Sequence, residues 1–211
     1  MKKTGIILIL TLLALNGFSQ KDPEAVSVLS EFSRKTTSAP SVIIEFDILA
    51  YDAMEDEETT MKGTAVICGD SYRVTLPDNI LWADGKTVWN YMPEVKEVTV
   101  TEPDPSDESF MSKPSLLFSM YEKGYKVRLL EQNEKEWIID LYPEAIDGNL
   151  VRIRLKIGKI LYDLRSAEYR TKDGMNITIT VLKYSLTFHP EAGYFTFNPA
   201  NYKGVEVIDM R

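Results

Sequence analysis

The sequence predicts a mainly β protein of the α+β class, built as an antiparallel sandwich or barrel with short helices. From Ser41 onward, apolar and polar residues alternate with period two. Short strand-like runs then recur at nearly regular intervals, separated by turn residues such as Asp84-Gly85 and Asp173-Gly174. This pattern favours hairpin-connected strands over βαβ units.

The first residues predict a secretory signal. Met1-Lys2-Lys3 is positively charged, Ile6–Leu15 is apolar apart from one threonine, and Gly17-Phe18-Ser19 follows. We expect residues 1–19 to be removed and residues 20–211 to form a single domain. The leader contains no cysteine, so no lipid is expected on an N-terminal cysteine.

A helix is predicted directly after the leader. Asp22 has the character of an N-cap, Pro23 suits the first helical position, and Glu24 suits the first turn. Ala25, Val28, Leu29 and Phe32 recur at helical spacing and form one apolar face. The helix is expected to end near Arg34–Lys35, where basic side chains complement its dipole.

The strand predictions follow from alternation and turn signals. The first strand begins after Ser41 and places Val42, Ile44, Phe46 and Ile48 on one face. Further strands are predicted at Thr64–Cys68, Tyr72–Leu76, Ile80–Ala83, Thr87–Tyr91, Val95–Thr101, Tyr125–Glu131, Trp137–Tyr142, Val151–Ile157, Ile160–Arg170, Met175–Thr187, Tyr194–Phe197 and Val205–Ile208.

One segment interrupts the β pattern. Thr101–Lys113 is rich in Pro, Ser and acidic residues and is predicted to be a loop. Pro114–Tyr121 then has the pattern of a short apolar helix stopped by Gly124. A helix this short needs to dock on the sheet to persist.

Charge and cysteine content exclude some partners. The formal net charge is −8 and no run of Lys or Arg follows the leader, so neither nucleic acid nor an anionic membrane surface is an expected partner. Cys68 is the only cysteine, which rules out an intramolecular disulfide. We expect this thiol to be buried and inert.

Catalytic signatures are lacking. His189 is the only histidine, and no nucleophile elbow, phosphate-binding loop or dinucleotide fingerprint is present. The acidic cluster of Asp52 and Glu55–Glu58 lacks the spacing of a calcium loop and is expected to be a solvated hairpin tip. Sequence does not reveal which carboxylates meet in space, so a glycosidase-like pair stays open. The prediction is a protein that is not an enzyme and uses no metal or cofactor.

Some strands are apolar on both faces. The first strand carries Ile43 and Leu49 opposite its main apolar face, and Met175–Thr187 places Ile177, Ile179 and Val181 on one side and Leu182, Tyr184 and Leu186 on the other. A two-sheet sandwich whose strands also meet helices would explain this. The alternative is a strongly curved sheet that encloses an apolar cavity, which these residues alone favour less than the sandwich.

The residues around one hairpin resemble a known family. Ala83–Tyr91 (ADGKTVWNY), followed by a proline and a strand, resembles the DGKTLWxYxP hairpin of LolA, the periplasmic lipoprotein carrier. Phe195–Pro199 followed by Gly204–Ile208 resembles the closing FxFxPPxGVxV segment of the family. The N-terminal helix with Leu29, the strand with Glu45 and Phe46, and Gly63 match in the same order.

The resemblance implies an incomplete antiparallel β-barrel, or half-barrel, whose apolar concave face is covered by short helices. The helices form a lid, and the family closes it with an arginine in an RPxxF-like context. Here Cys68-Gly69 stands in place of Arg-Pro and Tyr72 takes the aromatic position. The family's lid mechanism therefore does not carry over directly to this chain.

The same resemblance implies the partners and the site. Acylated lipoprotein cargo would come from an inner-membrane ABC transporter and pass to an outer-membrane acceptor, carried through the periplasm by a monomer. An alternative is a lipoprotein-sensing regulatory module of the RseB type, with the same fold. The predicted lining of the lipid-binding cavity is Phe46, Ile48, Val66, Tyr72, Trp89, Tyr91, Leu116, Phe118, Ile139 and Leu141.

Overall fold

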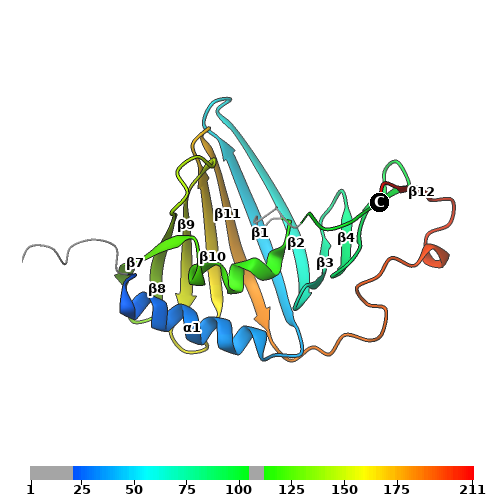
Figure 1. Cartoon of the computed structure of the whole chain (residues 1–211). Coiled ribbons are helices and arrows are strands. Elements are labelled where there is room, and N and C mark those ends of the chain that lie inside the picture. Colours follow the sequence, from blue (N-terminus) through cyan, green and yellow to red (C-terminus); the bar gives the residue numbers. More distant parts are fainter. Residues whose placement is uncertain (1–20, 105–111) are drawn as a thin grey trace, which may run out of the picture.

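The computed structural model describes residues 21–104 and 112–211 (Figure 1). The predicted signal at residues 1–19 and the centre of the predicted acidic loop therefore lie outside the described residues.

A single curved sheet of twelve strands dominates the structure (Figure 1). Its spatial order is β12-β6-β5-β4-β3-β2-β1-β11-β10-β9-β8-β7, and the two end strands do not pair with each other. All neighbouring strands are antiparallel except β12 and β6, which are parallel. The strands are β1 (Val42–Asp52), β2 (Glu57–Cys68), β3 (Ser71–Thr75), β4 (Ile80–Asp84), β5 (Val88–Met92), β6 (Glu97–Thr101), β7 (Tyr125–Gln132), β8 (Glu136–Pro143), β9 (Leu150–Gly158), β10 (Leu164–Thr171), β11 (Met175–Ser185) and β12 (Glu206–Asp209). The open half-barrel is confirmed, and the two-sheet sandwich is not formed.

The predicted N-terminal helix is present as α1 (Pro23–Thr37) and extends slightly beyond its predicted end. One carboxylate oxygen of Asp22 accepts hydrogen bonds from the backbone amides of Glu24 and Ala25, at 3.0 and 3.3 Å. The other accepts from the Leu129 amide of β7 at 3.3 Å, so the cap also ties the helix to the sheet. The apolar stripe of α1 is buried against one face of the sheet, which we call the inner face.

The segment predicted as a short helix forms two 3₁₀ helices instead, η1 (Pro114–Phe118) and η2 (Met120–Glu122). Both lie on the inner face beside α1, as Figure 1 shows. Neither has a side-chain cap in its first turn, and Ser119 separates them. The 3₁₀ geometry suits such short uncapped pieces because it closes backbone bonds over three residues.

The prediction that β11 is apolar on two faces is wrong, because β11 contains a β-bulge. Glu45 is paired with Lys183 and Phe46 with Val181, so Leu182 is an extra residue in the ladder. The bulge returns Tyr184 to the inner face with Ile177, Ile179 and Val181, and leaves Leu182 60% exposed. Nearly all the apolar surface of β11 therefore faces inward.

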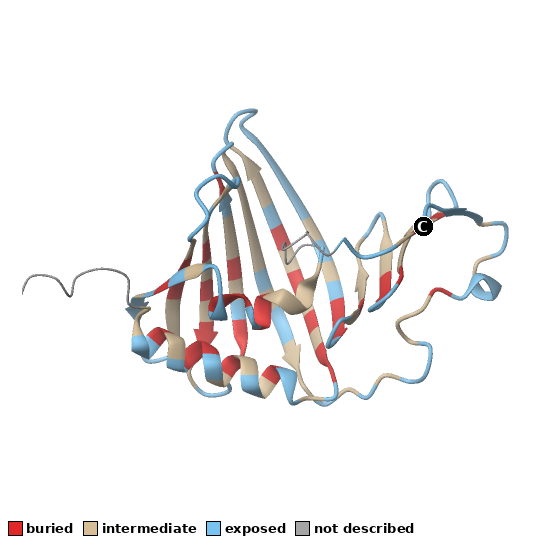
Figure 2. Cartoon of the chain, viewed as in Figure 1, coloured by how far each residue is buried: buried red, intermediate tan, exposed pale blue. Residues whose placement is uncertain are grey.

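Two apolar cores lie on opposite faces of the sheet. The larger core is formed by the inner face, α1 and the 3₁₀ helices, and its buried residues mark the facing sides of these elements in Figure 2. The smaller core lies on the outer face of β4–β6. There Trp82, Val98 and Val100 are covered by Phe197, Tyr202 and Val205 from the C-terminal segment.

The C-terminal segment differs from its predicted form. Tyr194–Phe197 is not a strand, because successive turns bring the amide of Tyr194 to the carbonyl of Glu191 and that of Thr196 to the carbonyl of Gly193. After the 3₁₀ helix η3 (Pro199–Asn201), the chain adds β12 to the edge of the sheet. The segment thus wraps the outer face before it joins the sheet.

Two smaller predictions are also corrected. The predicted strand Ile160–Arg170 begins only at Leu164, because Gly158–Asp163 forms a turn in which Tyr162 has a φ of +54°. Cys68 is exposed rather than buried, because it ends β2 at the turn into β3. The acidic cluster does form an exposed hairpin tip between β1 and β2, as predicted.

A charged network lies on the outer face of β8 and β9. The carboxylate of Asp140, whose side chain is 1% exposed, accepts two hydrogen bonds from Arg154 at 2.7 and 2.9 Å and one from the Tyr142 hydroxyl at 3.0 Å. Burial by itself raises the pKa of Asp140, but the bonds from Arg154 and Tyr142 outweigh it and the pKa lies below its ordinary value.

We predict that Asp140→Asn lowers the free energy of unfolding at neutral pH by about 2 kcal/mol, because it breaks a largely buried ion pair. The pKa of Asp140 is depressed in the folded state, so its stabilisation is complete above the unfolded value and is lost as pH falls through the folded value. The variant should therefore lose less stability than wild type when urea unfolding is followed below about pH 4. Glu45→Gln, at an exposed 2.8 Å ion pair with Lys183, is the control and should change little. Equal acid sensitivity in Asp140→Asn and wild type would contradict the prediction.

Candidate functional site

An apolar cavity of about 260 Å³ lies between the inner face and η1. Its walls come from β1, β2, β3, β4, β10 and β11, and η1 covers it with Leu117 and Pro114. Aliphatic and aromatic side chains predominate, and Tyr72 and Asn79 contribute the polar groups. The lining residues are Ile44, Phe46, Ile48, Ala65, Ile67, Tyr72, Val74, Leu76, Asn79, Leu81, Pro114, Leu117, Leu164, Ala167, Ile179 and Val181.

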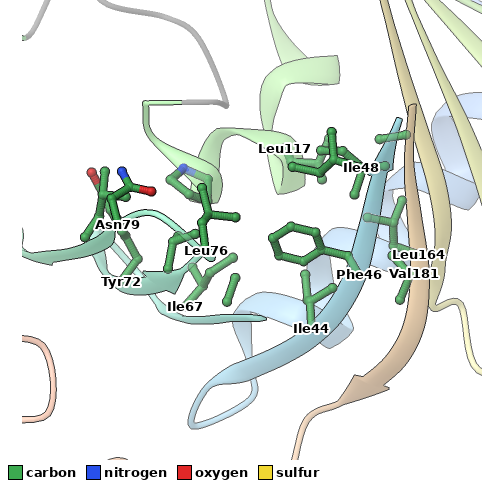
Figure 3. A pocket seen from close by; sticks show the side chains of 16 residues that line it. Ile44, Phe46, Ile48, Ile67, Tyr72, Leu76, Asn79, Leu117, Leu164 and Val181 are labelled. Carbon is green, nitrogen blue, oxygen red and sulfur yellow. The ribbon is translucent and has the colours of Figure 1, made fainter. Parts of the chain in front are cut away.

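Phe46 lies at the centre of this cavity. Its ring points from β1 toward Leu76, with Leu117 on the lid side (Figure 3). The ring fits because Gly63 is its partner across the β1–β2 ladder. A Cβ atom at Gly63 would lie 2.6 Å from Cζ of Phe46 and 2.7 Å from a methyl of Leu76, so the glycine makes room for these two lining side chains.

The position of the hollow follows from what covers the rest of the inner face. Over β8 and β9, the large side chains Ile139, Leu141 and Ile153 are fully buried in the core that α1 covers. Phe32 of α1 packs edge-on against Phe118 of η1, with ring centroids 5.7 Å apart. Beyond this contact α1 ends, and η1 is the element that covers the inner face over β1–β3.

Two further hollows adjoin the cavity. One, of about 330 Å³, shares Tyr72 and Leu81 with it and is lined at its outer end by Asp70, Glu102 and Lys113. The other, of about 250 Å³, shares Ile67 and lies between the end of α1 and η1. The two hollows therefore lie next to the cavity and on either side of η1.

Polar contacts hold η1 in place beside these openings. The Tyr72 hydroxyl donates to the backbone carbonyl of Ser112 at 2.8 Å, and the Lys113 ammonium lies 3.1 Å from a carboxylate oxygen of Asp70. Asp70 and Tyr72, which make these two contacts, come shortly after Cys68-Gly69 in the sequence. Cys68-Gly69 is the pair that stands where the family that the sequence resembles has Arg-Pro. At the end of α1, the Tyr184 hydroxyl is 2.6 Å from Oγ1 of Thr36, and burial raises the pKa of Tyr184 so that it stays neutral.

The predicted lining residues fall into separate groups. Phe46, Ile48 and Tyr72 line the cavity. Leu116 and Phe118 line the adjoining hollow next to the end of α1. Ile139 and Leu141 share the inner face but are buried in the packed core under α1. Their contact with a ligand stays a prediction.

Val66, Trp89 and Tyr91 do not line the cavity, because strand parity places them on the outer face. Val66 alternates with the lining residues Ala65 and Ile67 of β2. On the β4–β5 hairpin, Trp89 pairs with Trp82 and Tyr91 with Ile80, and all four belong to the outer core. Tyr202 of the C-terminal segment lies 4.8 Å from the ring of Tyr91 and 5.8 Å from that of Trp82.

Several lining residues were missed by sequence reasoning. Ile44 shares its alternation with Phe46 and Ile48, so parity could have found it. Ala65 and Ile67 flank the predicted Val66 in β2, and only the pairing register decides which of the two faces lines the cavity. Leu164 and Ala167 carry no sequence signal that separates them from ordinary core residues.

Among the described residues, those that line the cavity include no His, Cys, Asp or Glu. His189 is exposed, with Nδ1 3.1 Å from the carbonyl oxygen of Thr187. Within residues 21–104 and 112–211, no group of His, Cys, Asp or Glu is placed to hold a metal ion. The helices in those ranges are all too short or too polar to cross a bilayer.

An open half-barrel around an apolar cavity defines the class of protein, and comparison with known proteins supplies the family. The family model of the outer membrane lipoprotein carrier protein LolA matches residues 73–198, which is more than half of the chain. The chain therefore belongs to the LolA family.

Individual relatives are distant. Outer-membrane lipoprotein carrier proteins from two strains of Klebsiella pneumoniae are 27% identical over 153 residues, covering 67% of this chain and 66% of their own length. A conserved protein of unknown function from Thermus thermophilus has the same fold, with a TM-score of 0.59 at 11% identity, over 88% of this chain and 99% of that one. A LolA superfamily protein from Nitrosomonas europaea aligns at a TM-score of 0.44 and 13% identity, over 82% of this chain and 97% of that one.

We predict that Gly63→Ala lowers the free energy of unfolding by about 1 kcal/mol, because the new methyl group displaces the Phe46 ring and Leu76. Chemical denaturation measures this change. Gly148→Ala is the control, since nothing lies within 4 Å of a Cβ at that position. Adding Phe46→Leu to Gly63→Ala should recover part of the loss. If both glycine variants lose equal stability, crowding at Phe46 is not the cause.

We also predict that Tyr72→Phe loosens η1, because it removes the hydrogen bond to the Ser112 carbonyl. Loss of a hydrogen bond worth about 1 kcal/mol raises the population of the state in which η1 is open, and hence its amide exchange rate, roughly fivefold. Hydrogen exchange at the amides of Leu116 and Ser119, which both bond within η1, measures this opening. The amides of β9 serve as the internal reference. Unchanged exchange in η1 would show that Tyr72 is not an anchor of the cover.

Proposed function

We propose that this protein is a periplasmic carrier that binds the acyl chains of lipoproteins, or of related lipids, in its apolar cavity. It would receive them from an inner-membrane ABC transporter and deliver them to an acceptor at the outer membrane. Membership of the LolA family supports this role. The observation that carries it is the cavity itself, whose wall is apolar apart from Tyr72 and Asn79.

The chemistry of the wall suits lipid tails. Each methylene group moved from water into an apolar site gains about 0.8 kcal/mol, so free acyl chains need an apolar container. Side chains such as Phe46, Ile179 and Leu117 contact a tail without directional bonds. A ligand held in this way can be released by a change in cover alone, which suits a compartment without ATP.

The size of the cavity implies that the cover moves. Sites for small molecules usually measure about 300–1,000 Å³, and a cavity of about 260 Å³ lies below that range. The adjoining hollows flank η1, so displacing η1 would join them to the cavity. A short 3₁₀ helix is well suited to this, because its own hydrogen bonds contribute little stability.

The wider role combines several inferences. The predicted leader supports a location in the periplasm, and the absence of any catalytic signature in the sequence supports a binding protein without cofactor. Delivery to an acceptor without input of energy requires a modest affinity for the cargo. The cavity meets this requirement, because its polar anchors are few.

A paired substitution tests the cavity. Ala65→Leu adds bulk to the cavity wall without introducing charge, and we expect the affinity for a fluorescent fatty-acid probe to fall roughly tenfold while stability is kept. Trp89→Ala, in the outer core, should show the opposite pattern: stability falls and probe affinity is unchanged. Fluorescence titration and chemical denaturation on the same preparations measure both quantities. Absence of probe binding by the wild-type protein, or an equal loss in both variants, would refute cavity binding.

A cellular experiment tests the shuttle role. Depletion of the protein should cause lipoproteins to accumulate at the inner membrane, and mass spectrometry of the purified protein should find lipid or lipoprotein. A pull-down then separates the carrier from the regulatory alternative. Recovery of an ABC transporter supports the carrier, whereas recovery of an anti-sigma factor in its place supports a sensor of the RseB type.

A further inference from the structure

The turn between β9 and β10 presents two aliphatic side chains to water. Ile160 is 84% exposed and Leu161 is 62% exposed, at the end of the sheet where α1 lies. Figure 2 shows the turn as an exposed loop below α1. Single exposed apolar residues are ordinary, but adjacent ones at a projecting tip call for an explanation.

The backbone holds this tip in one conformation. The amide of Gly158 donates to the carbonyl of Asp163 at 2.9 Å, and that of Tyr162 donates to the carbonyl of Gly158 at 3.0 Å. The Lys35 ammonium of α1 donates to the carbonyl of Leu161 at 3.3 Å. The tip is thus fixed to both the sheet and the helix, so the exposure of Ile160 and Leu161 is built into the fold.

Amphipathic side chains surround the tip. The rings of Trp137 and Tyr162 lie 5.1 Å apart at its base. The Lys35 ammonium lies 4.8 Å from the centre of the Tyr162 ring, and that of Lys159 lies 5.1 Å from the centre of the Trp137 ring. Aliphatic tips flanked by Trp, Tyr and Lys are the composition found at the boundary between membrane and water.

The opposite end of the sheet provides a comparison. There the β8–β9 connection exposes Ile146 (86%) and the β1–β2 hairpin exposes Met54 (77%). The strand register places these turns at the end remote from α1. That end also carries Asp52, Glu55–Glu58, Glu144, Asp147 and Asp173, with Lys123, Lys126 and Lys172 as neighbouring cations. Such a surface is repelled by anionic lipid, although its apolar exposure is as large.

The charges near the β9–β10 tip are of mixed sign. Lys35, Lys135 and Lys159 lie around it, and Arg165 pairs with Asp163 at 2.8 Å. Glu134 and Glu136 belong to the neighbouring turn between β7 and β8. The cations nearest to the aliphatic pair are Lys35 and Lys159, which contact the residues of the tip or its base.

We propose that the β9–β10 tip is a membrane-contact site, in which Ile160 and Leu161 enter the surface of a bilayer that contains anionic lipid. Trp137 and Tyr162 then lie at the level of the headgroups, and Lys35 and Lys159 meet lipid phosphates. This inference goes beyond the proposed function, because it does not depend on what occupies the cavity. It adds a surface contact to a chain whose net charge of −8 predicts none.

Vesicle flotation tests the proposal. The purified protein is mixed with vesicles of phosphatidylethanolamine and phosphatidylglycerol, and with vesicles of phosphatidylcholine alone. We expect wild type to float with the first more than with the second. Ile160→Ser/Leu161→Ser should reduce binding to the anionic vesicles by at least roughly tenfold, because two inserted aliphatic side chains are lost. Ile146→Ser is the matched control at the remote end and should float like wild type.

Measurements of stability and of probe affinity separate a loss of membrane contact from a loss of folding. Both variants should keep the wild-type unfolding midpoint, since the replaced side chains are exposed, and both should keep the affinity for the fatty-acid probe. Lys35→Glu/Lys159→Glu should abolish the preference for anionic vesicles. The proposal is overturned if wild type binds neither kind of vesicle, or if the tip variant floats like wild type. It is also overturned if the protein does not bind vesicles and the tip substitutions abolish self-association in sedimentation experiments. The tip would then be a contact between copies of the protein.

Discussion

The structure depends on a mismatch between the inner face of the sheet and the elements available to cover it. A helix of 15 residues is about 22 Å long, and strands lie about 4.8 Å apart, so α1 can span roughly five strands. It extends from β7, which Asp22 contacts, to β11, whose Tyr184 contacts Thr36. The remaining inner face over β1–β3 is covered by η1, which is too short to fill it. A cavity results because the sheet is wider than its helical cover.

The cover is weakest where it encloses the cavity. α1 has a capped start and a fully buried apolar stripe, whereas η1 has few internal hydrogen bonds and is held by Tyr72, by Lys113 and by its packing on Phe32. Apart from its buried side chains Leu117 and Phe118, η1 is therefore held by a few local contacts. A protein that must take up and release an apolar ligand needs such an element beside the site, and the rest of the core can stay rigid.

The outer face explains why the conspicuous aromatic hairpin is not part of the cavity. Trp82, Trp89 and Tyr91 form a second small core with Phe197 and Tyr202. This core fastens the C-terminal segment and lets β12 extend the sheet beside β6. The same residues that carry the family resemblance therefore serve the architecture, whereas the cavity is lined by plainer residues such as Ile44, Ala65 and Val181.

The sequence by itself determined the class of fold, the first helix with its Asp22 cap, most strand positions and the inward face of β1, because these follow from local periodicity and turn chemistry. It also determined the family, through residues spread along the chain. Only the tertiary structure decided which face of β2 and β4 lines the cavity, because a shift of one residue in register reverses every side chain. It also decided that the bulge at Leu182 turns Tyr184 inward and that η1 covers the cavity, since both depend on partners distant in the sequence.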